Sequence, residues 1–398
     1  MTLVDSPAAW KRLAIAMLIG TIGSVGMWSF VVALPAVQAD FAVARGEASL
    51  PYTLTMIGFA FGGVFMGRLS DRYGVLPPLL LGGTALGLGY IAASFAPSLL
   101  LYAVAHLLVG LGASASFAPL MSDLSHWFAK RRGIAVALAS SGNYLAGTIW
   151  PPLVQHFIAQ NGWRPTTLAV GAFCLVTLLP LAFALRARAP VAAHSSGAPL
   201  SRFGTIDLSS NALLGLLIVA GVACCVAMSM PQVHIVAYCA DLGYGPARGA
   251  EMLSAMLGFG IISRIVSGFV ADRIGGLATL LIGSTLQGIT LFLYLFFDGL
   301  TSLYVISALF GLFQGGLVPM YAVIVREYFP AARSGGTLGL VIMATLFGMA
   351  FGGWISGWIF DVTGSYQMAF VNGLAWNLVN VAIISLLMMK RRFAPAAA

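Results

Sequence analysis

The second long apolar run of this sequence ends in Gly67-Arg68-Leu69-Ser70-Asp71-Arg72-Tyr73-Gly74, and the eighth ends in Gly268-Phe269-Val270-Ala271-Asp272-Arg273-Ile274-Gly275. Gly, Asp, Arg and Gly recur in the two stretches at one offset of 201 residues. The same offset relates further identical pairs, namely Gly110 and Gly311, Phe128 and Phe329, and Arg132 and Arg333. Self-similarity at a fixed offset is the signature of a repeated structural unit. The sequence therefore predicts a duplicated unit.

The composition indicates which solvent surrounds this unit. Of the 398 residues, 60% are hydrophobic and only 8% are charged, against roughly a quarter charged in soluble domains. So few charges cannot cover a soluble protein of this size, and a disordered chain would need low hydrophobicity. Soluble enzymes and disordered proteins are excluded, and a lipid bilayer is the expected environment.

The apolar runs give the number of membrane spans, because a helix needs about 20 apolar residues to cross a bilayer. Twelve runs are separated by short polar segments, at 11–36, 51–70, 77–96, 98–122, 133–159, 166–186, 210–236, 249–271, 277–297, 302–325, 336–359 and 367–389. The predicted fold class is an all-α membrane protein with twelve transmembrane helices in two six-helix, pseudo-symmetric halves.

Polar and charged residues give the domain organisation and the orientation. The longest polar stretch divides the runs six and six, which predicts a six-helix bundle over 1–185, a cytoplasmic linker over 186–208 and a second bundle over 209–398. With twelve spans, 16 of the 20 basic residues fall on the side of the two termini, and only Arg45, Arg164 and Arg248 fall opposite. Basic loops stay in the cytoplasm. We therefore expect cytoplasmic termini, and we assign the net charge of +8 to topology rather than to nucleic-acid binding.

The spans carry no sign of catalytic or metal chemistry. They hold no paired carboxylates, no His-Glu-x-x-His helix and no serine–base pair, and the chain has no phosphate-binding loop of the Gly-Lys-Ser/Thr type. The four cysteines lie within or at the ends of apolar runs, which disfavours a disulfide framework. We predict neither a catalytic site, nor a metal site, nor a cofactor.

Parallel duplicated halves joined by a linker are typical of transporters that rock around a central site. The repeated loops then suggest a gate, because a carboxylate can dock against a helix N-terminus or a basic loop. The candidate gating residues are Asp71, Arg72, Asp272, Arg273, Arg131, Arg132 and Arg333. The alternative is that these charges only anchor the topology.

One basic residue, Arg264, lies inside a span. It stands eight residues before Asp272, or about 12 Å along a helix, with Ile261, Ile262 and Ile265 around it. A charge at this depth is costly without a wet cavity or a partner, and no Asp or Glu lies clearly within a span. A substrate carboxylate is the simplest partner, since guanidinium binds it through two parallel hydrogen bonds. The alternative is a structural arginine bonded to backbone carbonyls.

The motifs also carry a family resemblance. The loop Gly-x-x-x-Asp-Arg-x-Gly resembles a signature of the major facilitator superfamily, and the likeness spans nearly the whole chain. Five segments resemble the branch of monocarboxylate transporters and oxalate–formate antiporters, at residues 127–135, 139–142, 162–164, 326–329 and 357–366. The resemblance implies the major facilitator fold and a substrate-binding arginine in helix eight, where Arg264 falls.

The chain also departs from that branch. Animal monocarboxylate carriers have an acidic residue one turn before the arginine and a lysine in helix one, and the matching residues here are Gly260 and Val32. The helix-eleven lysine of the oxalate antiporter has no counterpart, because no Lys or Arg lies between Arg333 and Lys390. These departures argue against proton coupling through an Asp–Lys pair and against a dicarboxylate substrate.

Other polar residues in the spans are further candidates for substrate binding. His234 can titrate near neutral pH, and so it suits either a coupling proton, a substrate contact or structural packing. Four more side chains could donate hydrogen bonds to a carboxylate or hydroxyl, although each also suits helix–helix contacts. They are Gln314, Tyr321, Asn143 and Tyr144.

We therefore predict a secondary transporter, not an enzyme, that moves a small organic anion, first of all a monocarboxylate, by alternating access. The alternative is a transporter of another small solute, by drug or metabolite efflux, in which Arg264 is structural. Proton symport, antiport and uniport stay open. The expected partners are the anionic substrate, protons and the lipid bilayer, and we expect no binding of nucleic acid. The protein is expected to be a monomer. The compactness of the chain and the family resemblance predict that the protein lies in a bacterial inner membrane.

Overall fold

The computed structural model describes residues 4–128, 132–187 and 204–392. In the described part of the first half there are nine helices: α1 (Pro7–Gly23), α2 (Val25–Phe41), α3 (Arg45–Ala48), α4 (Leu50–Tyr73), α5 (Leu76–Ser94), α6 (Leu99–Ser114), α7 (Ala118–Trp127), α8 (Arg132–Asn161) and α9 (Trp163–Ala184). The second half forms α10 (Ser210–Asp241), α11 (Pro246–Ile274), α12 (Gly276–Leu293), α13 (Leu300–Gln314), α14 (Leu317–Tyr328), α15 (Ala331–Thr363) and α16 (Gln367–Met389).

These helices correspond to the twelve predicted spans. Among the described residues, eleven helical segments are long and apolar enough to cross a membrane. Four of them are joined pairs of helices, namely α1 with α2, α3 with α4, α6 with α7 and α13 with α14. The remaining predicted span is α8, which has 30 residues and packs among the others. The prediction of an all-helical membrane fold is confirmed.

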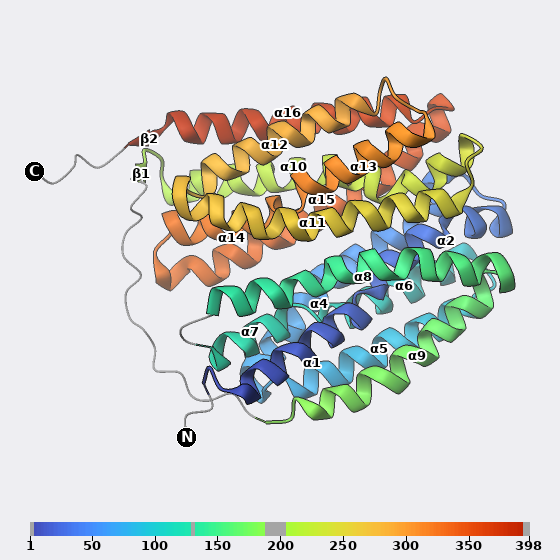
Figure 1. Ribbon diagram of the computed structural model, residues 1–398, viewed down its shortest axis with the longest axis horizontal. Helices are drawn as coiled ribbons and strands as arrows, with labels where there is room; N and C mark the ends of the chain where they lie inside the picture. Colours follow the sequence, from blue (N-terminus) through green and yellow to red (C-terminus); the bar gives the residue numbers. More distant parts are fainter. Residues whose placement is uncertain (1–3, 129–131, 188–203, 393–398) are drawn as a thin grey trace, which may run out of the picture.

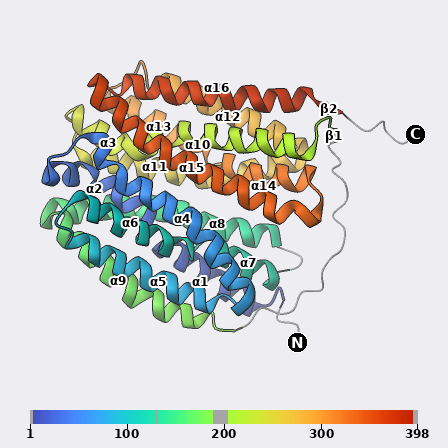
Figure 2. The ribbon, with the colours of Figure 1, turned by 180° about the vertical axis from the view of Figure 1, so that it is seen from behind.

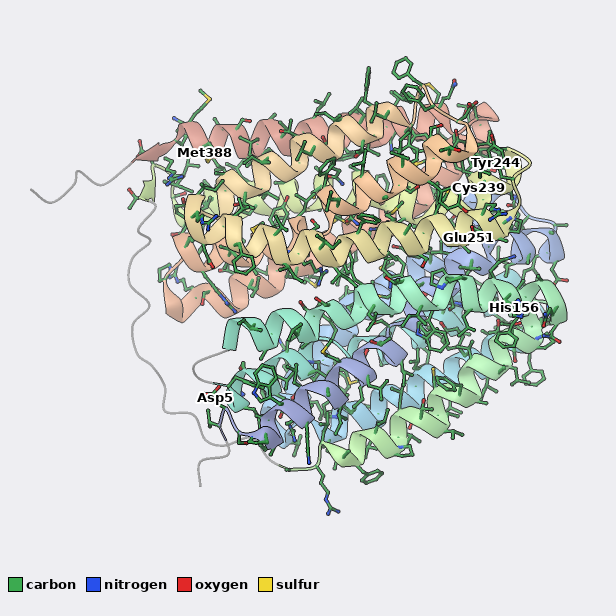
Figure 3. The ribbon with its side chains drawn as sticks, in the orientation of Figure 1. Asp5, His156, Cys239, Tyr244, Glu251 and Met388 are labelled. Atoms are coloured by element: carbon green, nitrogen blue, oxygen red, sulfur yellow. The ribbon has the colours of Figure 1, made fainter. Side chains whose placement is uncertain are left out.

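The helices lie in two groups that follow the order of the chain (Figure 1). Helices α1–α9 form one group and α10–α16 the other, and the view from behind agrees (Figure 2). Asp5 and Met388 mark one end of the bundle, which carries both termini, whereas His156 and Tyr244 mark the other (Figure 3). We refer to these as the terminal end and the far end. The exact boundaries at 185 and 209 stay predictions.

The duplication is visible in matching helix crossings. A Cβ atom on Gly110 would lie 1.9 Å from the carbonyl oxygen of Thr55, and one on Gly311 would lie 1.8 Å from that of Met256. The two partners are themselves 201 residues apart, like the glycines. The fourth and tenth spans thus approach the second and eighth equally closely, as small residues allow in membranes.

The repeated Gly-x-x-x-Asp-Arg-x-Gly stretches end α4 and α11 in the same way. Gly74 has φ 85° and Gly275 has φ 89°, a conformation that glycine adopts without a steric penalty. Each glycine terminates its helix, and the next helix begins within two residues. The last glycine of the motif is therefore required by the sharp turn.

The end of the predicted linker pairs with the C-terminal tail. Strand β1 (Thr205–Ile206) lies antiparallel to β2 (Arg391–Arg392), with Thr205 opposite Arg392. Most of the linker lies outside the described residues. The pairing of β1 with β2 fixes the place where the chain enters the second half, at the terminal end.

Candidate functional site

Arg264 lies between the two halves and is half-buried. Its Nε donates to the carbonyl oxygen of Gly315 over 3.2 Å, and its NH1 nitrogen donates to that of Ser140 over 2.9 Å. The guanidinium carbon stands 4.0 Å from the ring centre of Tyr144. Ser140 and Tyr144 belong to α8, whereas Gly315 follows α13. Arg264 thus joins the first half to the second.

The sequence explains why the carbonyl of Gly315 is open to Arg264. In a continuous helix this oxygen would accept from the N–H four residues later, but that residue is Pro319, which has no N–H. The break between α13 and α14 falls at residues 315–316. A backbone acceptor is thereby left at membrane depth, and Arg264 supplies the donor it needs.

Gly260 makes room for the aromatic partner of Arg264. It lies one turn earlier on α11, and a Cβ atom there would stand 2.3 Å from Cε1 of Tyr144. The ring of Tyr144 thus occupies the space beside Gly260, one turn before Arg264. Among the described residues, no carboxylate lies within ion-pair distance of Arg264. The π face of Tyr144 takes the place of an anion beside the cation.

Gln314 and Asn143 adjoin this group. The Tyr144 hydroxyl donates to Oε1 of Gln314 over 3.4 Å, and Nε2 of Gln314 is buried without a partner among the described residues. Asn143 accepts from Nε1 of Trp28 with Oδ1, at 2.8 Å, and so holds α8 against α2. The predicted residues Arg264, Tyr144 and Gln314 therefore meet, while Asn143 lies beside them and binds within its own half.

Tyr321 and His234 lie elsewhere. Tyr321 is fully buried and donates to Oδ1 of Asn380 over 2.9 Å, inside the second half. His234 is also fully buried and contacts Tyr366 and Gly353 near the far end. Neither contacts Arg264 in the structure.

The candidate gating residues lie at the terminal end. Asp71, Arg72, Asp272, Arg273 and Arg333 are exposed there. Arg132 begins α8, and Arg131 lies outside the described residues. No ion pair between two described residues includes Asp71, Arg72, Arg273 or Arg333.

Hydrogen bonds between described residues join the halves from the level of Arg264 to the far end. All hydrogen bonds that link a described residue of one half to one of the other lie in this region. Beyond Arg264, Ser254 donates to the carbonyl of Thr148, and Thr53 donates to that of Ala350 over 3.2 Å. The contacts of this structure therefore close the far end.

The residues that close the far end were not predicted from the sequence. Arg45 bonds to Asp241 at 3.0 Å and to Tyr366 at 2.6 Å, across the halves. The signal available was weak: Asp241 repeats Asp40 at the offset of 201 residues. The repeat marks a shared position, but it cannot tell which arginine faces it.

The arrangement can bind an anion by charge and hydrogen bonds. Two of the five guanidinium N–H donors bond to carbonyls, which leaves three for a ligand. Among the described residues, no group of three or more His, Cys, Asp or Glu side chains could hold a metal ion. Arg264 is the central group of the candidate site.

Comparisons with known proteins agree with a transporter. Monocarboxylate transporter 13 of Bos taurus is 30% identical over 380 residues, covering 93% of this chain and 85% of that protein. Human monocarboxylate transporter 11 is 30% identical over 320 residues, covering 76% and 66%. The MFS-type transporter pynF of Aspergillus niger is 24% identical, covering 82% and 75%. Because these relatives are eukaryotic, they do not support the expected bacterial inner membrane; they support a multi-pass membrane protein.

Solved structures support the fold. A bacterial homologue of the human lysosomal transporter Spinster, in an inward-facing and occupied conformation, superposes with a TM-score of 0.77 at 12% identity, over 98% of this chain and 100% of that one. The nucleoside transporter NupG gives 0.75 at 11% identity, over 95% and 99%. The Major Facilitator Superfamily matches residues 16–300 and, again, 241–397. With its duplicated six-helix halves, this chain belongs to the Major Facilitator Superfamily.

Proposed function

We propose that this protein carries a small organic anion with one carboxylate by alternating access of the two halves, 1–185 and 209–398, and that Arg264 binds the carboxylate. The observation that carries the proposal is a cation at membrane depth, held by two carbonyls and a ring, without a carboxylate partner among the described residues. Its position between the halves suits a substrate site near the midplane.

The neighbours of Arg264 support a monoanion. Backbone carbonyls and the Tyr144 ring stabilise the cation but do not neutralise its charge. The buried Nε2 of Gln314 supplies a further donor without a partner among the described residues. The equivalent of Arg264 in the first half is Gly63, so the duplication does not provide a second cation. Relatives named monocarboxylate transporters support the same substrate class.

The two carbonyl contacts also favour a second candidate, in which Arg264 is purely structural and the protein exports a drug or another metabolite. Arg264 would then connect α8 to the break between α13 and α14. The two candidates differ in one respect: only the first makes binding of carboxylates depend on Arg264.

Thermal unfolding of the purified protein with a panel of small carboxylic acids separates them. A ligand that binds the folded state stabilises it by about 2.7 kcal/mol at a hundred times its Kd. We expect some monocarboxylates to raise the Tm of the wild type and to leave that of Arg264→Ala unchanged. Arg248→Ala is the matched control, because this exposed arginine on the same helix pairs with Glu251. An equal response of wild type and Arg264→Ala would favour the structural role.

The terminal end would carry the second gate. Asp71, Arg72, Asp272 and Arg273, with the basic residues Arg131, Arg132 and Arg333, would pair when the halves close there and the far end opens. The bias of basic residues towards the termini supports a cytoplasmic location of this end. Protease cleavage of a C-terminal tag in sealed, oriented vesicles tests that orientation. Cleavage only from the extracellular side would overturn it.

A further inference from the structure

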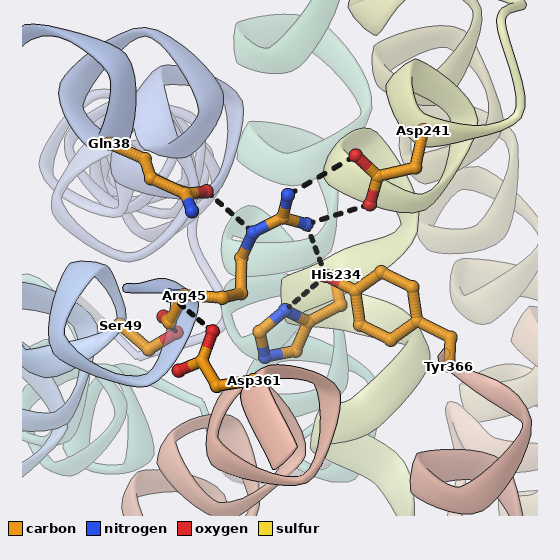
Figure 4. Close-up of polar contacts among 7 residues, drawn as sticks. All are labelled: Gln38, Arg45, Ser49, His234, Asp241, Asp361 and Tyr366. Atoms are coloured by element: carbon orange, nitrogen blue, oxygen red, sulfur yellow. Dashed lines mark hydrogen bonds and ion pairs between the residues drawn. The ribbon is translucent and has the colours of Figure 1, made fainter. Parts of the chain in front are cut away.

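The far end of the bundle is closed by a group of polar residues around Arg45 (Figure 4). The two outer nitrogens of its guanidinium donate to the carboxylate of Asp241 over 3.0 and 3.2 Å, and NH1 also donates to the hydroxyl of Tyr366 over 2.6 Å. Asp361 accepts from the backbone N–H groups of Arg45 and Gly46, both at 2.7 Å. Arg45 is 7% exposed. A two-pronged charged bond between partly buried groups is among the strong polar contacts in proteins.

The internal repeat shows that this bridge is particular to one position. Asp40 is the counterpart of Asp241, 201 residues earlier. It pairs with Arg164 over 3.0 Å, and both residues belong to the first half. Asp241 belongs to the second half and pairs with Arg45 of the first. The two aspartates are equivalent but their arginine partners are not, and of the two ion pairs only that of Asp241 must break for the halves to separate at the far end.

A buried histidine extends the group into the protein. His234 is fully buried, and its Nε2 lies 2.7 Å from the carbonyl oxygen of Gly353. A carbonyl can only accept, so Nε2 carries the hydrogen. Its Nδ1 lies 3.0 Å from the hydroxyl of Tyr366. That same hydroxyl oxygen accepts from Arg45.

The direction of each hydrogen bond follows from these contacts. Guanidinium has only donors, so Tyr366 accepts from Arg45. Burial raises the pKa of Tyr366, although Arg45 opposes part of this shift, and the phenol keeps its single hydrogen. This hydrogen is donated to Nδ1 of His234, which must then be an unprotonated acceptor. Arg45 thus donates to Tyr366, Tyr366 donates to His234, and His234 donates to the carbonyl of Gly353. This chain of bonds requires a neutral imidazole.

A proton on Nδ1 is incompatible with this chain. The new N–H would point at the Tyr366 oxygen, where Arg45 already donates, and the hydroxyl hydrogen would lose its acceptor. The imidazolium would also add a positive charge next to Arg45. We propose that His234 is a proton-binding site, and that a proton taken from water onto its Nδ1 displaces Arg45 from Tyr366 and opens the far end.

The surroundings give the other groups that could take part. The charged and titratable side chains around the cluster come from every element packed there: Arg45 on α3, Tyr52 on α4, Tyr238 and Asp241 on α10, Asp361 on α15, and Tyr366 between α15 and α16. The two carboxylates, Asp241 and Asp361, stabilise the closed state when they are ionised, because both accept from Arg45 or its backbone. Either of them could respond to acid in place of His234, so the test must distinguish them.

Distances between spin labels at the far end measure the opening directly. Ala44 and Ala247 are exposed there, one on each half. The four native cysteines are buried, so labels attach first to cysteines introduced at these two positions. In lipid nanodiscs without any added carboxylate, we expect the wild-type distances to lengthen between pH 8 and pH 5. The measurement is independent of the substrate, so its failure would leave the role of Arg264 intact.

Variants assign the response to one residue. His234→Gln retains a donor for Gly353 and an acceptor for Tyr366 but cannot be protonated, so we expect short distances at both pH values. His106→Gln is the matched control, since His106 is equally buried in the first half and lies apart from the cluster. It should respond to pH like the wild type. Opening of His234→Gln at pH 5 would assign the response to a carboxylate and overturn the proposal, as would a wild type that does not open.

A second variant covers the case in which His234→Gln does not fold. Tyr366→Phe keeps the ring and the Arg45–Asp241 pair but removes the hydroxyl that links Arg45 to His234. We expect it to lose the pH-dependent lengthening. An unchanged response in Tyr366→Phe would contradict transmission through this hydroxyl.

Discussion

Arg12 and Asp123 form a buried, two-pronged ion pair between α1 and α7, with contacts of 2.6 and 3.0 Å. Arg12 also donates to the carbonyl of Leu185 over 2.9 Å, and its guanidinium carbon lies 4.5 Å from the ring centre of Trp127. The pair ties α1 to the end of the fourth span. It lies within one half, so it persists whichever end of the protein is open.

The repeat offers a way to replace this ion pair. The residues equivalent to Arg12 and Asp123 are Leu213 and Ile324, which are buried together in an apolar cluster of the second half. Removing one member of a buried pair costs about 3–5 kcal/mol, whereas an apolar pair can be neutral. We expect Asp123→Ile alone to lower the Tm strongly, and Arg12→Leu with Asp123→Ile to recover most of the loss. A double variant no more stable than the single one would contradict this.

The matching glycines should be intolerant of substitution in both halves. A Cβ atom on Gly110 or Gly311 would lie within 2 Å of a backbone oxygen, which cannot move away cheaply. Overpacking of this kind costs about 1–3 kcal/mol. The controls are Gly67→Ala and Gly268→Ala, because a Cβ there meets nothing within 4 Å. Thermal unfolding in detergent should show a lower Tm for Gly110→Ala and Gly311→Ala only. Equal effects at all four positions would contradict the close approach of the helices at Gly110 and Gly311.

Gly260 should control the position of Tyr144. With a Cβ only 2.3 Å from its Cε1 atom, Gly260→Ala must push the ring away from Arg264. A cation–π contact is worth about 0.5–2 kcal/mol, so binding of a stabilising carboxylate should weaken by about two- to thirtyfold. Gly258→Ala is the control two residues away, where a Cβ makes only an ordinary contact of 3.6 Å with Thr148. Calorimetric titration measures both, and equal affinities would exclude a role for the ring.

Tyr321 should affect stability and not binding. Its hydroxyl donates to Asn380, which in turn donates to Ser284 over 2.7 Å. Tyr321→Phe leaves Oδ1 of Asn380 without its donor, at a cost of about 1–3 kcal/mol. We expect Tyr321→Phe to have a lower Tm than the wild type. The fraction of the variant that stays folded should bind carboxylates with the same affinity as the wild type. A loss of affinity without a loss of stability would place Tyr321 at the substrate instead.

The sequence predicted the features that depend on local pattern and on the repeat. Apolar runs predicted the helices, and the offset of 201 residues predicted the duplication now visible at Gly110 and Gly311. The position of Arg264 near the centre of its span follows from simple counting along a helix. These features are periodic or local, so they do not require knowledge of how the halves meet.

The contacts between the halves could not be predicted in this way. Arg45 and Asp241 are 196 residues apart, and their pairing depends on the rotation of one half against the other. Equally, His234 could have lined a cavity or packed, and only the structure places it against Tyr366. The sequence identifies polar residues in the membrane, but their partners come from packing at an interface that has no local signal.

The matching crossings at Gly110 and Gly311 bear on the ancestry of the protein. Two contacts whose partners are displaced by the same number of residues are most simply inherited from one ancestral six-helix protein. The charges are not shared in this way, since Arg12, Asp123 and Arg264 correspond to Leu213, Ile324 and Gly63. An ancestor that assembled from two identical subunits would have carried every charge twice. Fusion into one chain freed the copies to diverge, so that one kept a buried ion pair and the other a lone cation.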